Sequence, residues 1–289
     1  MIRLEQLTKA YGKFVAVNAI DLHVPRGELF GFLGPNGAGK TTTLRMIAGI
    51  MRPTSGRIRL GGDDLLTNPT AAKRRLGFIP DRPFVYEKLT GAEFLRFVAG
   101  LYGQDGPVVD RRIDELFELF ELAVWKHELV ESYSHGMRQK LIISSALIHR
   151  PECIVVDEPM VGLDPRGARL LKDIFRAFVE RGGTVLMSTH TLEVAQAMCD
   201  RIAIIQEGNI VARGTIAELR QQTAAGDASL EELFLKLTGG EAIQELAAIL
   251  SEESGIGSQE TGAGRPKPGV RDQDAGAGAA EPHGRRADS

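Results

Sequence analysis

Short apolar runs recur along the chain and alternate with longer stretches in which apolar residues repeat every three or four positions. The run Leu29–Leu33 contains no polar residue, which is typical of a strand buried on both faces of a sheet. Strands that alternate with helices indicate an α/β fold. The predicted strands are residues 2–7, 29–33, 154–156, 185–187 and 202–205.

The strand pattern disappears in the middle of the chain. Between residues 90 and 150 the apolar positions follow helical spacing. We therefore predict a helical subdomain, at about residues 88–150, inserted into an α/β core. The apolar positions that carry this pattern are Phe94, Leu95, Val98, Ile113, Leu116, Phe117 and Phe120.

The composition changes after Thr238. The 289 residues are 43% apolar, enough to bury a full core in one large domain or two unequal ones. Residues 239–289 are instead rich in Gly, Ala, Glu and Pro, and one short helix is predicted there at residues 242–250. We predict a folded domain over residues 1–238 and a disordered tail over 239–289. A docking or regulatory tail is the alternative.

Charge and cysteine content narrow the class of protein. A net charge of −3 gives no general attraction to nucleic acid, so no nucleic-acid partner is predicted. Cys153 and Cys199 have neither disulfide nor metal-site spacing. The first residues contain no signal-peptide core, and no stretch approaches the ~20 apolar residues that span a bilayer. We expect a cytoplasmic protein.

The first strand-to-helix junction, residues 34–41, reads GPNGAGKT. Its glycines let the backbone present N–H groups to a phosphate, and the helix that follows directs its N-terminal dipole at the same anion. Lys40 supplies a charge for the β- and γ-phosphates, and Thr41 a hydroxyl for Mg²⁺. The predicted phosphate-binding residues are Gly34, Pro35, Asn36, Gly37, Ala38, Gly39, Lys40, Thr41 and Thr42.

A second strand end, which carries two acidic residues, complements this loop. The apolar run at residues 153–156 ends in Asp157 and Glu158, and strand ends of this kind bind ligands in open α/β sheets. We predict that Asp157 binds Mg²⁺, directly or through water, and that Glu158 acts on the attacking water. The predicted cofactors are ATP and Mg²⁺.

Between these two motifs lies Tyr133-Ser134-His135-Gly136-Met137-Arg138-Gln139. This segment resembles the signature loop of ATP-binding cassette (ABC) ATPases, and the chain resembles that family over residues 1–238. The resemblance implies a phosphate-loop NTPase (RecA-like) core with an antiparallel β subdomain and an inserted α-helical subdomain. It also implies that Ser134 and Gly136 complete the nucleotide site of a second chain.

The resemblance assigns further roles. Tyr11 matches the aromatic residue that stacks on adenine, although a simple turn tyrosine is the alternative. His190 matches the histidine that contacts the γ-phosphate and the attacking water. Residues 162–164 match the loop that crosses the dimer interface. Asp81 stands where the family has a metal-sensing glutamine, and we expect it to reach Mg²⁺ through water.

The departures from the family pattern point to one branch. The chain resembles ATPase subunits of type-2 multidrug-export systems at four places, which are His135, Met137, Asp81 and the closing segment at residues 230–238. That branch implies a homodimer, or a pair of ATPase subunits, bound to integral membrane permease subunits of about six helices. We therefore expect a cytoplasmic subunit held at the inner face of the cell membrane by its permease.

Two other function classes also use a phosphate loop. A non-transport ABC ATPase that acts on ribosomes or DNA is disfavoured by the single cassette and by the absence of a basic patch in the sequence. A phosphate-loop kinase or switch protein leaves the signature segment unexplained. A six-helix membrane protein encoded by the neighbouring gene would favour export.

Overall fold

The computed structural model describes residues 1–82, 84–160, 163–222 and 234. The predicted tail at 239–289, its short helix and most of the segment at 230–238 lie outside these residues, as does Gly162. The bounds predicted for the domain and for the tail therefore stay predictions.

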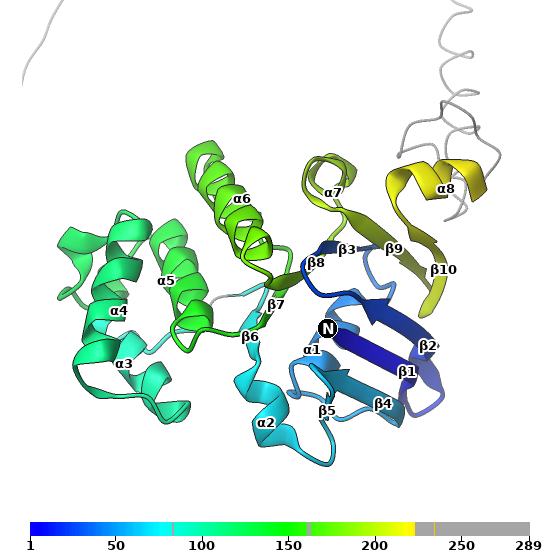
Figure 1. Cartoon of the computed structure of the whole chain (residues 1–289), viewed down its shortest axis with the longest axis horizontal. Helices are drawn as coiled ribbons and strands as arrows, with labels where there is room; N and C mark the ends of the chain where they lie inside the picture. The colour runs from blue at the N-terminus through cyan, green and yellow to red at the C-terminus, as the bar shows by residue number, and fades with distance from the viewer. Residues whose placement is uncertain (83, 161–162, 223–233, 235–289) are drawn as a thin grey trace, which may run out of the picture. The chain divides into compact units, whose positions relative to one another are not determined.

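A six-stranded sheet forms the centre of the described chain (Figure 1). Its order is β10-β9-β3-β8-β7-β6, and all neighbouring pairs are parallel except β9 with β10. Every residue of β3, β7 and β8 is buried, as expected for strands covered on both faces. The strands are β3 (Leu29–Leu33), β6 (Leu76–Ile79), β7 (Cys153–Asp157), β8 (Thr184–Thr189), β9 (Arg201–Gln206) and β10 (Asn209–Gly214).

The two faces of this sheet pack into different cores. Along β3, Leu29 and Leu33 join one apolar cluster, while Phe30 and Phe32 join another. The first cluster includes residues of α6, and the second includes residues of α1. The helices around the sheet are α1 (Lys40–Ile47), α2 (Pro69–Arg74), α6 (Pro165–Glu180), α7 (Leu192–Met198) and α8 (Ile216–Gln222).

A second, antiparallel sheet lies on the α1 side of the core and has the order β2-β1-β4-β5. Its presence confirms the antiparallel β subdomain. The strand predicted at residues 2–7 is the start of the longer β1. The strands are β1 (Ile2–Tyr11), β2 (Phe14–Val24), β4 (Ser55–Leu60) and β5 (Asp63–Asp64).

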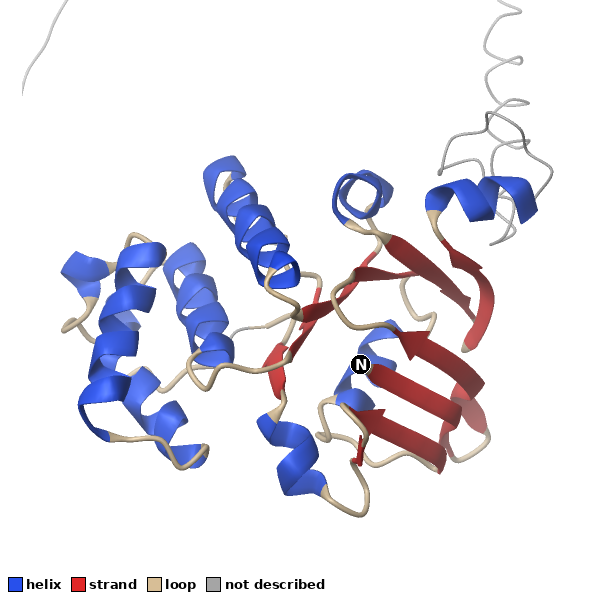
Figure 2. Cartoon of the chain, in the orientation of Figure 1, coloured by secondary structure: helices blue, strands red, loops and turns tan. Residues whose placement is uncertain are grey.

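Helices replace strands between β6 and β7, which confirms the inserted helical subdomain as part of the fold (Figure 2). Thr90 starts this group with a capping box, in which its hydroxyl accepts from the N–H of Glu93 and Glu93 bonds back to Thr90. The elements are α3 (Gly91–Leu101), α4 (Gly106–Leu119), the 3₁₀ turns Ala123–Trp125 and Val130–Ser132, and α5 (His135–Leu147).

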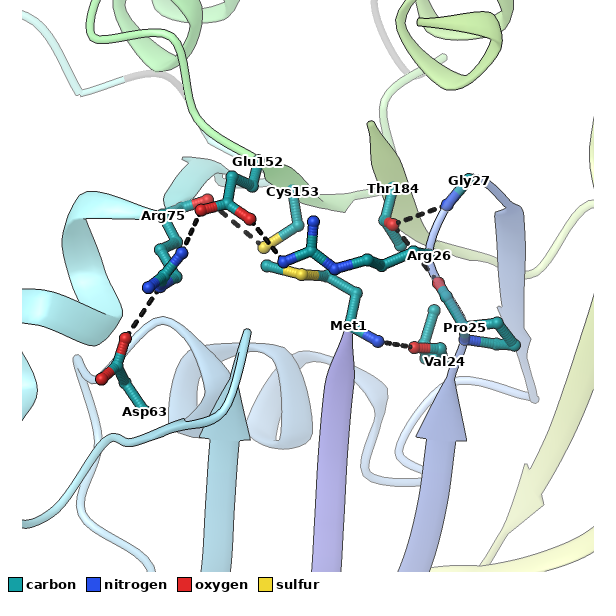
Figure 3. A network of polar contacts seen from close by, with 10 residues as sticks. All are labelled: Met1, Val24, Pro25, Arg26, Gly27, Asp63, Arg75, Glu152, Cys153 and Thr184. Carbon is teal, nitrogen blue, oxygen red and sulfur yellow. Dashed lines mark hydrogen bonds and ion pairs between the residues drawn. The ribbon is translucent and has the colours of Figure 1, made fainter. Parts of the chain in front are cut away.

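A polar network at the amino ends of the core strands joins the two sheets (Figure 3). Arg75 bonds both Asp63 of β5 and Glu152, the residue before β7. Arg26 reaches the other oxygen of Glu152 at 2.6 Å. The single carboxylate of Glu152 is therefore shared by two arginines that lie far apart in the sequence.

His149 is buried against the same region of the core. Its ring stacks on Tyr102 with centroids 3.6 Å apart, and its Nε2 lies 3.0 Å from the carbonyl oxygen of Leu76. That carbonyl can only accept, so Nε2 carries the proton and donates it. Among the described residues Nδ1 has no partner, and burial lowers the pKa of His149 to about 4.

This burial predicts a pH dependence of stability. The unfolded chain takes up a proton near the ordinary value of 6.5, whereas folded His149 resists protonation until about pH 4. The free energy of unfolding should therefore fall as the pH is lowered from 6.5 to about 4. The slope from this group should approach about 1.4 kcal/mol per pH unit. Denaturant unfolding of the parent and of His149→Gln at pH 7, 6 and 5 measures it. Parallel curves for the two proteins would contradict the assignment.

Candidate functional site

The loop at residues 34–39 joins β3 to α1, and its glycines are required by its surroundings. A Cβ on Gly34 would lie 2.3 Å from the carbonyl oxygen of Ile205, and one on Gly39 would lie 2.5 Å from that of Ala16. Gly39, the residue before α1, also has φ of +105°, a conformation that side chains rarely adopt. The backbone therefore forms a tight concave turn at the helix N-terminus.

Lys40 is held inside this turn. Its side chain is 6% exposed, and its Nζ donates to the carbonyl oxygens of Gly34 at 2.7 Å and Pro35 at 3.2 Å. Nζ also lies 3.9 Å from Glu158 Oε1. Burial lowers the pKa of Lys40, and the charges of Glu158 and Asp157 counteract part of that shift. The ammonium group thus sits where the loop would receive an anion.

The acidic pair is positioned by the next strand of the sheet. Asp157 is the last, fully buried residue of β7, and its Oδ1 accepts a hydrogen bond from the hydroxyl of Ser188 on β8. The backbone N–H of Glu158 donates to the same hydroxyl at 3.1 Å. Glu158 has φ of +49°, a strained conformation of the kind found at functional sites. Sequence reasoning missed Ser188, because its role depends on the parallel pairing of β7 with β8, which places it opposite Asp157.

His190 meets Glu158 from the end of β8. Its Nδ1 lies 2.9 Å from Glu158 Oε1. The Glu158 carboxylate is therefore flanked by a buried ammonium and an imidazole, which fix its orientation. A carboxylate held in this way can accept a proton from a water molecule or orient that molecule.

A cavity of about 430 Å³ is lined by Lys40 and Glu158, but not by Asp157 or His190. It brings together Tyr11, the loop, Asp81 and Glu158, all of which the sequence singled out. Phe14 was missed: it pairs with Tyr11 across the β1–β2 hairpin, and both rings are exposed. The cavity is lined by Tyr11, Phe14, Ala16, Asn36, Gly37, Gly39, Lys40, Thr41, Thr42, Asp81 and Glu158.

Tyr11 is held in place from two sides. Its hydroxyl donates to the sulfur of Met51 at 2.9 Å, and Lys9 Nζ lies 5.1 Å from the centre of its ring. Lys9 is itself anchored by a bond to the carbonyl oxygen of Arg52. The ring is therefore a fixed aromatic surface beside the cavity, suited to stacking on a planar base.

Asp81 approaches the cavity from the loop after β6. Its Oδ1 lies 3.7 Å from Nη2 of Arg45 on α1, a partner that sequence reasoning did not predict. Arg45 stands four positions after Thr41, so the two residues share one face of α1.

Ser134 and Gly136 do not line this cavity. Ser134 caps α5, where its hydroxyl accepts from the N–H of Met137 at 3.3 Å. A Cβ on Gly136 would meet no atom within 4 Å, so nothing described within this chain requires a glycine there. Arg138 fixes the turn by donating to the carbonyl oxygens of Tyr133 and Glu131.

Asp164 has a local structural contact. Its Oδ1 accepts from the N–H of Gly167 at 2.8 Å and caps α6. Gly162, its predicted neighbour in the interface loop, lies outside the described residues.

None of the described helices is both long enough and apolar enough to cross a membrane.

Comparison with known proteins identifies the family to which this chain is similar. Residues 17–161 match the family described as ABC transporter. A daunorubicin/doxorubicin resistance ATP-binding protein, DrrA, of Streptomyces peucetius is 38% identical over 255 residues, which are 88% of this chain and 76% of that protein.

Two solved structures share the fold. One, described as the ATP-binding subunit of an ABC transporter, has 34% identity and a TM-score of 0.78, and the match covers 82% of this chain and 99% of that one. The other is a dimeric ATP-binding cassette in a post-hydrolysis state with ADP and Pi. It has 24% identity and a TM-score of 0.69 over 75% of this chain and 99% of that one.

Proposed function

Because this chain belongs to the ABC transporter family of ATP-binding proteins, we propose that it hydrolyses ATP to power an export system with separate membrane subunits. The observation that carries the catalytic part is Glu158, held between Lys40 and His190 at the cavity that contains the phosphate loop. Export, rather than import, is supported by the relative named for drug resistance.

We infer one orientation for ATP in the cavity. The triphosphate follows the loop, where backbone N–H groups and Lys40 neutralise its charge. The adenine ring then lies toward the hairpin, where Tyr11 supplies the fixed aromatic surface and Phe14 a second ring. Stacking on either ring is tolerant of base identity, so the phosphates carry most of the affinity.

The oxygen donors near the loop fit Mg²⁺. They are the hydroxyl of Thr41 and the carboxylates of Asp157 and Asp81. Among the described residues no three His, Cys, Asp or Glu side chains form a metal site by themselves, but Mg²⁺ commonly binds one or two carboxylates together with substrate phosphates. Bound there, Mg²⁺ would neutralise charge that develops on the phosphates. Ser188 orients Asp157 toward this task through its hydrogen bond.

Hydrolysis then depends on two side chains of this chain. Glu158 would orient or deprotonate the attacking water. His190 holds the Glu158 carboxylate, and we infer that it also contacts the γ-phosphate. Lys40 balances the negative charge of Glu158 while no nucleotide is bound and turns to the β- and γ-phosphates when ATP enters.

A second copy of the chain completes each site. The open space beside Gly136 and the exposed Ser134 at the start of α5 suit an anion that approaches from outside the chain. We infer a head-to-tail homodimer, or a pair with a second ATPase subunit, in which Ser134 and Gly136 contact the partner's γ-phosphate. ATP would then hold the closed pair together, and loss of the γ-phosphate would open it.

The membrane subunits are proposed to dock near residues 81–86. Phe84 is 77% exposed, and its ring contacts Tyr86, which contacts the exposed Phe97 of α3. Exposed apolar groups gathered in this way mark interaction sites. Docking there would hold the chain at the inner face of the cell membrane.

Phe84→Asp should reduce co-purification with the permease by roughly ten-fold or more, because it buries a charge in the interface. ATP binding should not change. Val124→Asp is the matched control, since Val124 is an 85% exposed apolar residue elsewhere in the helical subdomain. Undiminished permease binding by Phe84→Asp, or an equal loss in both variants, would remove this docking site.

Export itself is tested by cloning the neighbouring genes and co-expressing this chain with any six-helix membrane protein that they encode. The proposal expects a stable complex in membrane fractions and ATP hydrolysis that responds to transported compounds. A chain that stays out of the membrane fraction and instead sediments with ribosomes or DNA would support the non-transport alternative.

A further inference from the structure

Asp81 has a cationic partner that a glutamine in its place would not need. Its carboxylate lies 3.7 Å from the Arg45 guanidinium, and it also lines the nucleotide cavity with Thr41 and Glu158. Glutamine is neutral and binds a metal through its amide oxygen. Aspartate adds a negative charge to a cavity that already holds Glu158, so a nearby cation is favourable when no metal is bound.

The ion pair between Arg45 and Asp81 is weak enough for Asp81 to change partners. The Arg45 and Asp81 side chains are 45% and 36% exposed, and ion pairs with this exposure are weak. Mg²⁺ is a stronger partner for a carboxylate at close range because it carries two charges. The Arg45–Asp81 ion pair is therefore weak enough for Asp81 to exchange Arg45 for a metal ion, and it contributes little to the stability of the fold.

The two partners lie at different positions along α1. The α-carbon of Arg45 lies one turn after that of Thr41, about 6 Å further along the helix axis, and the Arg45 guanidinium is the cation in contact with Asp81. Aspartate is also one methylene shorter than glutamine, by roughly 1.5 Å. To bind a metal held at Thr41, Asp81 would give up its contact with Arg45.

We propose that Arg45 is a positioning residue that holds Asp81 off the metal site until Mg-ATP is bound, when Asp81 exchanges Arg45 for the metal. This inference rests on the proposed ATP-binding function. The loop that carries Asp81 leads to Phe84, Tyr86 and Glu87, and Glu87 accepts a hydrogen bond from Arg138 of α5 at 2.8 Å. The exchange thus links nucleotide to the docking surface and to the signature turn.

The test compares Arg45→Met, Asp81→Asn, the double variant and Arg45→Lys, all in the Glu158→Gln background, in which we expect ATP not to be hydrolysed. A fluorescent ATP analogue is titrated first in EDTA and then, at fixed nucleotide, with Mg²⁺. In EDTA, Arg45→Met should bind the analogue roughly two- to five-fold more weakly because Asp81 is uncompensated. Its half-saturating Mg²⁺ concentration should fall by a similar factor because Asp81 is released.

The double variant separates this mechanism from a direct effect of Arg45 on ATP. Without the Asp81 charge, loss of Arg45 should change neither value, and Arg45→Lys should behave like the parent. The same weakening by Arg45→Met in the Asp81→Asn background would overturn the exchange. Arg96→Met is the matched control, because Arg96 and Asp110 form an ion pair with 53% and 51% exposure on the helical subdomain.

The failure of this inference is distinguishable from failure of the proposed function. Lys40→Met reports on the nucleotide site alone. If the parent binds the analogue and Lys40→Met does not, the site is established, and an Arg45→Met variant that matches the parent overturns only the exchange. If the parent shows no saturable binding, the proposed function itself falls.

Discussion

Replacing Glu158 with glutamine is expected to stop ATP hydrolysis while ATP binding is kept. Glutamine has the same shape but cannot accept a proton, so the rate should fall by roughly 10²–10⁴-fold. The change also removes a negative charge next to the γ-phosphate, so affinity for ATP should stay equal or increase. The hydrogen bond from His190 can still be made to the amide oxygen.

Phosphate release and equilibrium nucleotide binding, measured on the same preparation, test this expectation. Glu193→Gln is the control, because Glu193 is an exposed carboxylate three residues after His190 and does not line the cavity. Hydrolysis near the parent rate in Glu158→Gln would show that another group is the base.

Lys40→Met is expected to abolish useful ATP binding. The buried ammonium offsets the charge of Glu158, and its loss leaves that carboxylate facing the phosphates without compensation. Removing one member of a buried charge pair costs about 2–5 kcal/mol, which corresponds to roughly 30- to 3,000-fold in affinity. Methionine keeps the apolar stem, so the fold should survive.

Calorimetric titration with Mg-ATP and thermal unfolding of the same variant separate lost binding from lost structure. Lys73→Met is the control, since Lys73 is an exposed lysine whose hydrogen bond within the described residues goes to the backbone carbonyl of Gly49. Retained micromolar binding by Lys40→Met, or an equal loss by Lys73→Met, would contradict the role given to Lys40.

Features that depend on neighbouring residues were predictable from the sequence. The β3 strand, the glycine-rich turn and the start of α1 lie within 20 consecutive residues, so their chemistry is visible as one pattern. Asp157 and Glu158 follow the same rule, because a buried strand delivers both to the edge of the sheet. The helical subdomain was visible for the same reason, through its apolar spacing.

Features that depend on long-range register were not predictable. Ser188 orients Asp157 only because β7 and β8 pair in parallel with these two residues opposite each other. Arg45 meets Asp81 because β6 ends beside α1, which no local pattern reports. Phe14 was overlooked for a different reason: it is one of many aromatic residues, and its place opposite Tyr11 depends on the turn between them.

The central claim is that each nucleotide site is shared between two chains, and the mass of Glu158→Gln in solution tests it most directly. With Mg-ATP, light scattering should give twice the chain mass of 31.4 kDa, and with ADP it should give a single chain. Adding Gly136→Asp, which places a charge in the open space beside the signature turn, should prevent the dimer. A single chain in Mg-ATP, or an undiminished dimer with Gly136→Asp, would contradict the shared site.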